Sequence, residues 1–156
     1  MIKAGIGTAV FVAASDQLSK LIILAIVMQP PRVIEITEFF NLVLVWNRGV
    51  SFGMLQSDSI WGPILLGAVT VGIIVLLFFW LREAKTRLSV TALGLVIGGA
   101  LGNLIDRILH QAVVDFLDFH MSGYHWPAFN VADSAITVGV ICIIYESLFE
   151  STEKAS

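Results

Sequence analysis

The sequence has few charged residues and a single cysteine, and both shortages narrow what the chain can be. Lys, Arg, Asp and Glu make up 13% of its 156 residues, whereas soluble domains carry about 25%. One cysteine, Cys142, excludes an intrachain disulfide, and its apolar neighbours indicate a small core or lipid-facing side chain. A net charge of −3 provides no basic patch, so we expect no nucleic-acid partner.

Motifs of metal-dependent and serine-dependent hydrolases are also missing. The histidines at 110, 120 and 125 match no zinc-ligand spacing, and neither HExxH nor CxxC occurs. A metal held by Asp115, Asp118 and His120 is an alternative that rests on residue type alone. No serine lies beside a base in a motif typical of a catalytic triad. We therefore expect no metal and no organic cofactor.

Apolar residues are abundant instead: they form 57% of the chain, and the mean hydropathy is +0.89. A chain of this length needs fewer apolar residues than this to form one small core, so we expect the remaining apolar side chains to face lipid. A helix spans a bilayer with about 20 apolar residues. We predict one membrane domain, 1–156, with spans at about 4–28, 59–81, 88–107 and 132–149.

The first apolar segment has a second interpretation, a cleaved signal peptide. Lys3 precedes an apolar run that ends at Val12-Ala13-Ala14, as such peptides do. Apolar residues resume after Lys20, however, which favours a retained span that ends before Pro30.

Basic residues indicate how the spans are oriented. They concentrate in the short 82–87 loop and near the two termini, which an even number of spans places on one side. Because cytoplasmic loops are enriched in Lys and Arg, we predict that the termini are cytoplasmic and that 29–58 and 108–131 are periplasmic. The basic residues on the predicted cytoplasmic side are Lys3, Arg82, Lys85, Arg87 and Lys154.

The two outer segments contain stretches typical of strands. Residues 33–37, 41–46 and 113–119 are rich in β-branched and aromatic side chains, with partial alternation. The predicted fold class is thus an all-α membrane protein, a bundle of four transmembrane helices with a small periplasmic β element.

Two aspartates near the outer membrane face are the main candidates for chemistry. Asp115 lies in VVDF and Asp133, 18 residues later, in FNVADS. A carboxylate near hydrocarbon costs roughly 2.5–3.5 kcal/mol at mid-bilayer, and two carboxylates that share a proton can activate water. The alternatives are ordinary ones: Asp133 is a helix cap or first-turn acid, and Asp115 is a strand acid facing water.

Polar residues in two of the spans lie near the same face. Asn103, Asp106 and Arg107 share a helix face in GNLIDR. They either form a polar helix end from which Arg107 reaches lipid phosphate, or support a catalytic carboxyl. Asp16 and Lys20, spaced i,i+4, form a structural ion pair or border the substrate site.

Three further residues lie in the predicted loops. Asn47 can donate to and accept from a peptide backbone, and Gly49 permits a close backbone approach, although an ordinary turn is the alternative for both. Asn130, three residues before Asp133, caps the fourth span or bonds a catalytic group.

Glycines recur at every fourth residue of the third span, at Gly94, Gly98 and Gly102. Such spacing lets helix backbones approach closely. We expect this stripe to contact another helix of the same chain rather than a second copy, which makes the protein a monomer.

Five sequence blocks, taken together, carry a resemblance to a known family. They are DQLSK (16–20), WNRGVSFG (46–53), GGALGNLIDR (98–107), VVDF (113–116) and FNVADSAI (129–136). Their order and approximate spacing resemble those of the lipoprotein signal peptidases, also called signal peptidase II.

The resemblance implies an aspartyl endopeptidase of the bacterial inner membrane, without metal or organic cofactor. Such an enzyme cleaves diacylglyceryl-modified prolipoproteins N-terminal to the lipidated cysteine, in contact with membrane lipid, and binds globomycin-type inhibitors. It implies that Asp115 and Asp133 form the catalytic dyad. The positions implied to bind substrate or support the dyad are Asp16, Lys20, Asn47, Gly49, Asn103, Asp106, Arg107 and Asn130. Arg48 and Ser51 depart from the family pattern, in which smaller residues are common.

Two other classes of protein remain as alternatives from the residues alone. A transporter or channel would line its path with Asp16, Lys20 and Asp106, but transporters place charge near the midplane, whereas these acids gather at one face. A structural membrane subunit would use the glycine stripe for assembly. Only a protease would shorten a lipidated precursor without a gradient or partner.

Overall fold

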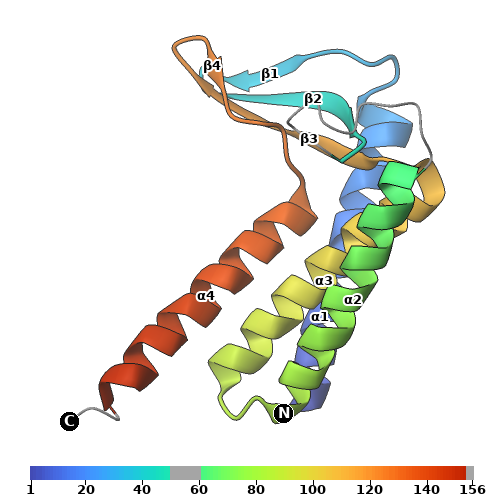
Figure 1. The fold of residues 1–156 in the computed structure, drawn as a ribbon. Coiled ribbons are helices and arrows are strands. Elements are labelled where there is room, and N and C mark those ends of the chain that lie inside the picture. Colours follow the sequence, from blue (N-terminus) through green and yellow to red (C-terminus); the bar gives the residue numbers. More distant parts are fainter. Residues whose placement is uncertain (50–60, 154–156) are drawn as a thin grey trace.

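The structure, a computed structural model, describes residues 1–49 and 61–153. Four long helices and four strands form the described part of the chain (Figure 1). In chain order they are α1 (Ile2–Ile22), which continues as the π-helix η1 (Ile23–Val27), β1 (Ile34–Thr37), β2 (Phe40–Asn47), α2 (Trp61–Glu83), α3 (Arg87–His110), β3 (Val113–Met121), β4 (Tyr124–His125) and α4 (Val131–Glu153).

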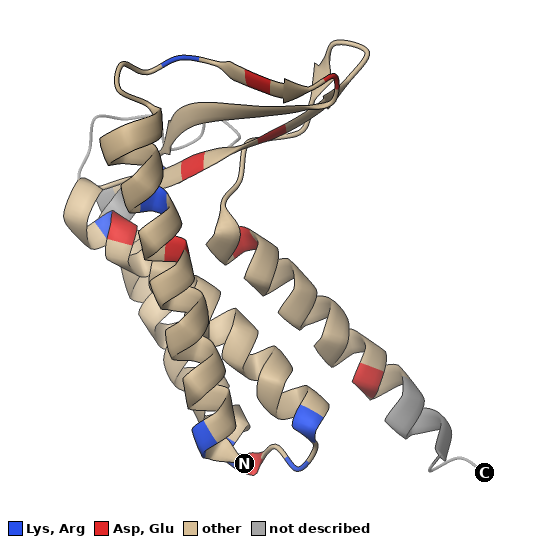
Figure 2. Cartoon of the chain, turned by 180° about the vertical axis from the view of Figure 1, so that it is seen from behind, with Lys and Arg blue, Asp and Glu red and all other residues tan. Residues whose placement is uncertain are grey.

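Helix α3 is the centre of the bundle, and α1, α2 and α4 each pack against it. The sheet lies across one end of the bundle, which we call the sheet end. The N-terminus, the α2–α3 connection and the C-terminal end of α4 lie at the opposite end, which we call the terminal end (Figure 1). Basic positions lie at both ends of the molecule, and one group of them surrounds the start of α1 and the α2–α3 connection at the terminal end (Figure 2).

All four helices are long and apolar enough to cross a membrane, which confirms the predicted fold class. The span limits stay predictions, but the helices run beyond several of them. Helix α3 continues to His110, and α4 continues through Glu153, so the segment 150–153 is helical. Ser59, where the second predicted span begins, and Lys154 lie outside the described residues.

The predicted strands are confirmed, with one addition. The sheet is antiparallel with strand order β1-β2-β3-β4. Its register pairs Val45 with Asp115 and Asn41 with Asp118, with an irregularity between them. The short β4, which the sequence did not reveal, pairs His125 with His120.

A small apolar cluster fastens the sheet to the bundle. Ile23 and Met28, at the end of the first helix, are buried against Phe116 of β3. Because Phe116 follows Asp115 directly, this contact helps to hold Asp115 in its position relative to the helices.

The glycine stripe of α3 faces α1, as predicted. A Cβ atom built on Gly94 would lie 2.6 Å from the Gly5 carbonyl oxygen, and one on Gly98 would lie 2.5 Å from the Ala9 carbonyl oxygen. Such separations are far below van der Waals contact, so these glycines allow the two backbones to touch.

We expect Gly98→Ala to lower the free energy of unfolding by about 1–3 kcal/mol, because the added methyl group meets backbone that cannot rotate away. Gly72→Ala is the matched control, since a Cβ there has nothing within 4 Å. Thermal unfolding in detergent measures both variants. Equal melting temperatures would contradict the close α1–α3 contact.

Candidate active site

Polar side chains from five elements converge inside the sheet end of the bundle. Most are almost fully buried, and burial of a polar group costs free energy unless the group forms a hydrogen bond or an ion pair. The residues of this polar cluster are Asp16, Lys20, Asn47, Asn103, Asp106, Asp115, Asn130 and Asp133.

The first turn of α4 brings Asp133 to the cluster. Asp133 N–H donates to Asn130 Oδ1 at 2.9 Å, and Asn130 N–H donates to Asp133 Oδ2 at 3.2 Å. These reciprocal bonds form a capping box, in which each residue satisfies a backbone donor of the other. Asp133 is therefore a first-turn acid, as one interpretation predicted. The hydrogen bonds of the capping box also hold its side chain in one orientation.

Asn130 connects the two aspartates. Besides capping Asp133, its Nδ2 donates to Asp115 Oδ1 at 2.7 Å and to the Val114 carbonyl oxygen at 3.3 Å. Both predicted roles of Asn130, cap and partner of a carboxylate, are thus present in one side chain. The structure therefore brings the Asp115 carboxyl and the backbone of Asp133 to the same side chain, while the Asp133 carboxyl accepts from the Asn130 backbone N–H.

Asp115 is 1% exposed, at the bundle side of the sheet. The pKa of its carboxyl is raised to about 6: burial is the largest cause and the nearby charge of Asp133 adds to it, while hydrogen bonds from Asn47 and Asn130 act in the opposite direction. The Asn47 bond runs from Nδ2 to Asp115 Oδ2 at 2.9 Å. Asp115 therefore keeps a proton at a pH at which an exposed aspartate has lost it.

Asn103 links Asp133 to a deeper ion network. Its Nδ2 donates to Asp133 Oδ1 at 2.8 Å, while its Oδ1 accepts from Lys20 Nζ at 3.3 Å. Lys20 Nζ lies 2.7 Å from Asp16 Oδ2 and 2.8 Å from Asp106 Oδ2. The predicted Asp16–Lys20 pair is confirmed, and Asp106 joins it as a third charge.

The network also holds backbone groups at the sheet end. Asp16 Oδ1 accepts from the Ala132 N–H at 2.9 Å, and Asp106 Oδ2 accepts from the Val114 N–H at 3.0 Å. Ala132 and Val114 each precede a candidate catalytic aspartate. The ion network therefore positions both backbones that carry the dyad.

Gln17 is a member of this network that the sequence reasoning missed. Its Nε2 donates to Asp106 Oδ1 at 2.8 Å and to the Gly102 carbonyl oxygen at 3.1 Å. Its position next to Asp16 in DQLSK could have indicated this role. A glutamine that lies in sequence between two ion-paired residues is, however, also typical of an ordinary helix surface.

Asn47 and Gly49 form the turn that ends β2. Gly49 has a φ of 101° and donates its N–H to Asn47 Oδ1 at 2.9 Å. The positive φ favours glycine at this position, and a Cβ there would lie 2.2 Å from Leu66 Cδ1, so that side chain would have to move. The turn thereby aims the Asn47 amide at Asp115. Arg48 is exposed beside it, and Ser51 lies outside the described residues.

Arg107 belongs to the predicted set but, among the described residues, makes no hydrogen bond to either candidate aspartate. Its Nη1 donates to the Asn103 carbonyl oxygen at 3.2 Å, within the same helix. The side chain is half-buried and lies within electrostatic range of Asp133, Asp106 and Asp115. It lines a cavity of about 420 Å³ between α2 and α3.

Asp118 and His120 do not join Asp115 in a metal site, the alternative raised from residue type. Asp118 accepts instead from His125 Nδ1 at 2.9 Å and from Asn41 Nδ2 at 3.1 Å. Burial acts to raise the pKa of Asp118, but these bonds outweigh it and hold the pKa below its usual range. This separate cluster ties β3 to β2 and β4.

Comparisons with known proteins identify the family of this chain. The family model described as Signal peptidase (SPase) II matches residues 8–149. The lipoprotein signal peptidase of Nitrobacter hamburgensis is 44% identical over 155 residues, covering 96% of this chain and 94% of that protein. That of Burkholderia vietnamiensis is 46% identical over 144 residues, covering 92% and 86% respectively.

Solved structures resemble the fold over nearly its whole length. One bacterial membrane enzyme, determined by the in meso method at 2.3 Å resolution, gives a TM-score of 0.83 with 36% identity, covering 99% of this chain and 93% of that one. Another, at 1.9 Å, gives 0.81 with 37% identity, covering 95% and 94%. The chain therefore belongs to the signal peptidase II family, the proteases that remove signal peptides from prolipoproteins, and it is a multi-pass bacterial membrane protein.

Proposed function

We propose that Asp115 and Asp133 are the catalytic pair of an aspartyl endopeptidase that cuts diacylglyceryl-modified prolipoproteins N-terminal to the lipidated cysteine. The single observation that carries this proposal is Asn130, whose side-chain Nδ2 donates to the Asp115 carboxyl and whose backbone N–H donates to the Asp133 carboxyl. Two aspartates whose carboxyl groups are bound by one residue, one of them buried, can divide the roles of acid and base between them.

The chemistry follows from the different surroundings of the two carboxyls. Asp115, the buried member, holds the proton and donates it to the scissile carbonyl oxygen. Asp133 accepts hydrogen bonds from Asn103 Nδ2 and Asn130 N–H and draws a proton from water. The hydroxide adds to the carbonyl carbon and forms a gem-diol. As the gem-diol collapses and the C–N bond breaks, one of its hydroxyls returns a proton to Asp115, and Asp133 passes the proton it took from water to the leaving cysteine nitrogen.

We place the sheet and the dyad at the periplasmic face of the inner membrane, with both termini cytoplasmic. The basic positions at the terminal end support this orientation through the preference of Lys and Arg for the cytoplasm (Figure 2). The acyl chains of a substrate then stay in the bilayer, where each buried CH₂ contributes about 0.8 kcal/mol. Globomycin-type inhibitors would occupy the same site, and the chain acts as a monomer.

A reconstituted cleavage assay tests the proposal. The purified chain in lipid bicelles is expected to cleave a precursor that carries a diacylglyceryl cysteine and to leave the unlipidated precursor intact. Mass spectrometry of the product locates the cut bond. Cleavage of both precursors at equal rates, or at another bond, would contradict the proposed substrate.

The pH dependence of kcat/KM provides a test of the acid. We expect activity to fall as the pH rises through the pKa of Asp115, about 6 in the free enzyme, because the proton donor is then lost. The Asn47 hydrogen bond lowers that pKa, so Asn47→Ala should move the alkaline limb to higher pH. Asn41→Ala is the control, since Asn41 lies on the same strand but bonds Asp118. An unmoved limb in Asn47→Ala would contradict the role of Asp115.

A further inference from the structure

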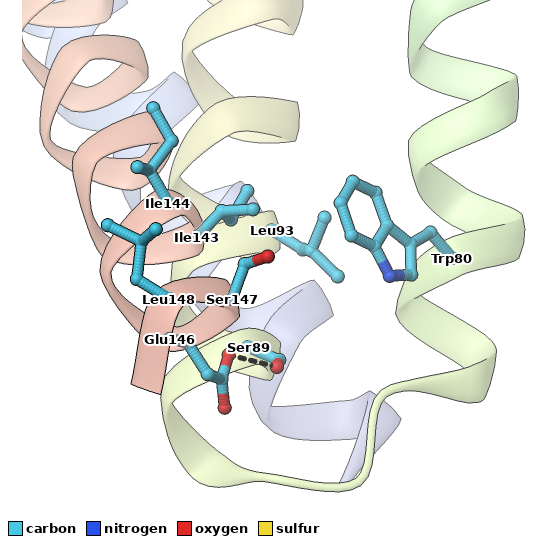
Figure 3. A pocket seen from close by; sticks show the side chains of 8 residues that line it. All are labelled: Trp80, Ser89, Leu93, Ile143, Ile144, Glu146, Ser147 and Leu148. Carbon is cyan, nitrogen blue, oxygen red and sulfur yellow. Dashed lines mark hydrogen bonds between the residues drawn. The ribbon is translucent and has the colours of Figure 1, made fainter. Parts of the chain in front are cut away.

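A second cavity lies at the terminal end of the bundle, far from the aspartates. It has a volume of about 380 Å³ and is bordered by three helices (Figure 3). Trp80 comes from α2, Ser89 and Leu93 from α3, and Ile143 and Glu146 from α4. The proposed cleavage chemistry uses none of these residues.

Glu146 is the charged group of this cavity. Its carboxylate accepts a hydrogen bond from Ser89 Oγ (Figure 3). It also accepts one from Thr86 Oγ1, a second hydroxyl at the start of α3. Thr86 is the N-cap of α3, and its Oγ1 accepts from the Ser89 N–H at 3.0 Å. Within residues 1–49 and 61–153, no lysine or arginine forms a salt bridge with Glu146. Its charge is therefore held by neutral donors.

Trp80 completes a site suited to a cation. Its indole ring reaches toward Leu93 from the α2 side, while Glu146 lies on the α4 side (Figure 3). An ammonium or guanidinium group between a carboxylate and an indole face gains both ion pairing and cation–π attraction. The aliphatic stem of a Lys or Arg side chain matches the apolar wall formed by Leu93 and Ile143.

The cavity and the dyad lie along the same face of α3. Asn103, which bonds Asp133, and Ser89, which bonds Glu146, are 14 residues apart on α3, close to four helical turns, so they share a face. At 1.5 Å per residue their axial separation is about 21 Å. A helical peptide that runs from the dyad to the cavity therefore needs about 14 residues.

Signal peptides have this length and polarity. A basic n-region precedes an apolar h-region of 7–15 residues, which in turn precedes the cleavage site. We infer that the cavity receives a Lys or Arg side chain from the n-region of the precursor, paired with Glu146 and stacked on Trp80, while the scissile bond lies at the dyad. This inference rests on the proposed function and names a second contact of the same substrate.

The neighbouring basic residues do not fill or block this site. Arg82, Lys85 and Arg87 are exposed and do not line the cavity. Salt screens exposed charges over about 8 Å at physiological ionic strength, so these residues oppose a bound cation less than the adjacent Glu146 attracts it. They are free to contact lipid phosphates at the cytoplasmic face.

A kinetic cycle with two precursors and two enzymes tests the inference. One lipidated precursor has lysine in its n-region, and the other has glutamine at the same positions. For the unaltered enzyme, we expect a KM about three- to tenfold lower for the lysine precursor. In Glu146→Gln this preference should disappear through a higher KM for the lysine precursor, with kcat at saturating substrate unchanged. Glutamine keeps an acceptor for Ser89 and Thr86.

Two further variants make the result specific. Glu83→Gln removes an exposed acid at the same end of the bundle outside the cavity, and it should keep the preference for lysine. Trp80→Leu should reduce the preference partly. A preference that persists in Glu146→Gln, or a KM that rises equally for both precursors, overturns the inference and leaves Glu146 as a structural link between α3 and α4. Failure of the unaltered enzyme to cut either precursor counts against the proposed function instead.

Discussion

Replacing Asp115 by asparagine is expected to abolish cleavage of a lipidated precursor, with a loss of about a thousandfold or more in kcat/KM. The amide cannot hold a transferable proton, so the scissile carbonyl loses its acid. The fold should survive, because asparagine has nearly the same shape and needs no charge compensation at this buried position. Asp133→Asn is expected to cause a similar loss, since the base then disappears.

Asp118→Asn is the matched control for this pair of variants. It makes the same chemical change on the same strand, but Asp118 bonds Asn41 and His125 and does not contact the dyad. We expect it to retain turnover. Membrane insertion and thermal unfolding of all three variants separate lost chemistry from lost folding. Near-normal turnover by Asp115→Asn or Asp133→Asn would refute the dyad.

Replacing Lys20 by methionine is expected to lower the free energy of unfolding by about 3–5 kcal/mol. Lys20 is 2% exposed and lies between Asp16 and Asp106, which are also buried. Without its ammonium group, the two carboxylates keep their desolvation cost and lose their common partner. Because these carboxylates bind the Ala132 and Val114 amides, activity should fall together with stability.

A double variant tests whether charge is the cause. Adding Asp16→Asn to Lys20→Met restores the net charge of the cluster and should recover part of the lost stability. Lys85→Met, at an exposed position outside the network, should leave the melting temperature almost unchanged. Thermal unfolding in detergent compares the variants. If Lys20→Met unfolds at the unaltered temperature, the network does not stabilise the fold.

The helices and most of the sheet were predictable because their signals are local. Apolar runs of about 20 residues identify spans without knowledge of their neighbours, and β-branched stretches identified β1, β2 and β3. Strand β4 escaped because it has only two residues, Tyr124 and His125, and its pairing is set by the hairpin with β3. The extension of α3 to His110 also depends on its junction with the sheet, which hydropathy does not record.

The candidate site was predictable in its residue types but not in its connections. The residues in the five blocks suggested which side chains matter, yet the bonds between them join distant parts of the chain. Asp16 reaches an amide 116 residues away, and Gln17 reaches Asp106 at a separation of 89 residues. No periodicity encodes such contacts. Nor did the sequence indicate that Asn130 would serve as helix cap and carboxylate partner at once.

Asn130 links the proposed dyad to the first turn of α4. If the start of α4 frays, the Asn130 side chain loses the Asp133 N–H, and its hydrogen bond to Asp115 is no longer held in place. Under the proposed mechanism, unwinding of this one helical turn would therefore remove the arrangement of both aspartates together.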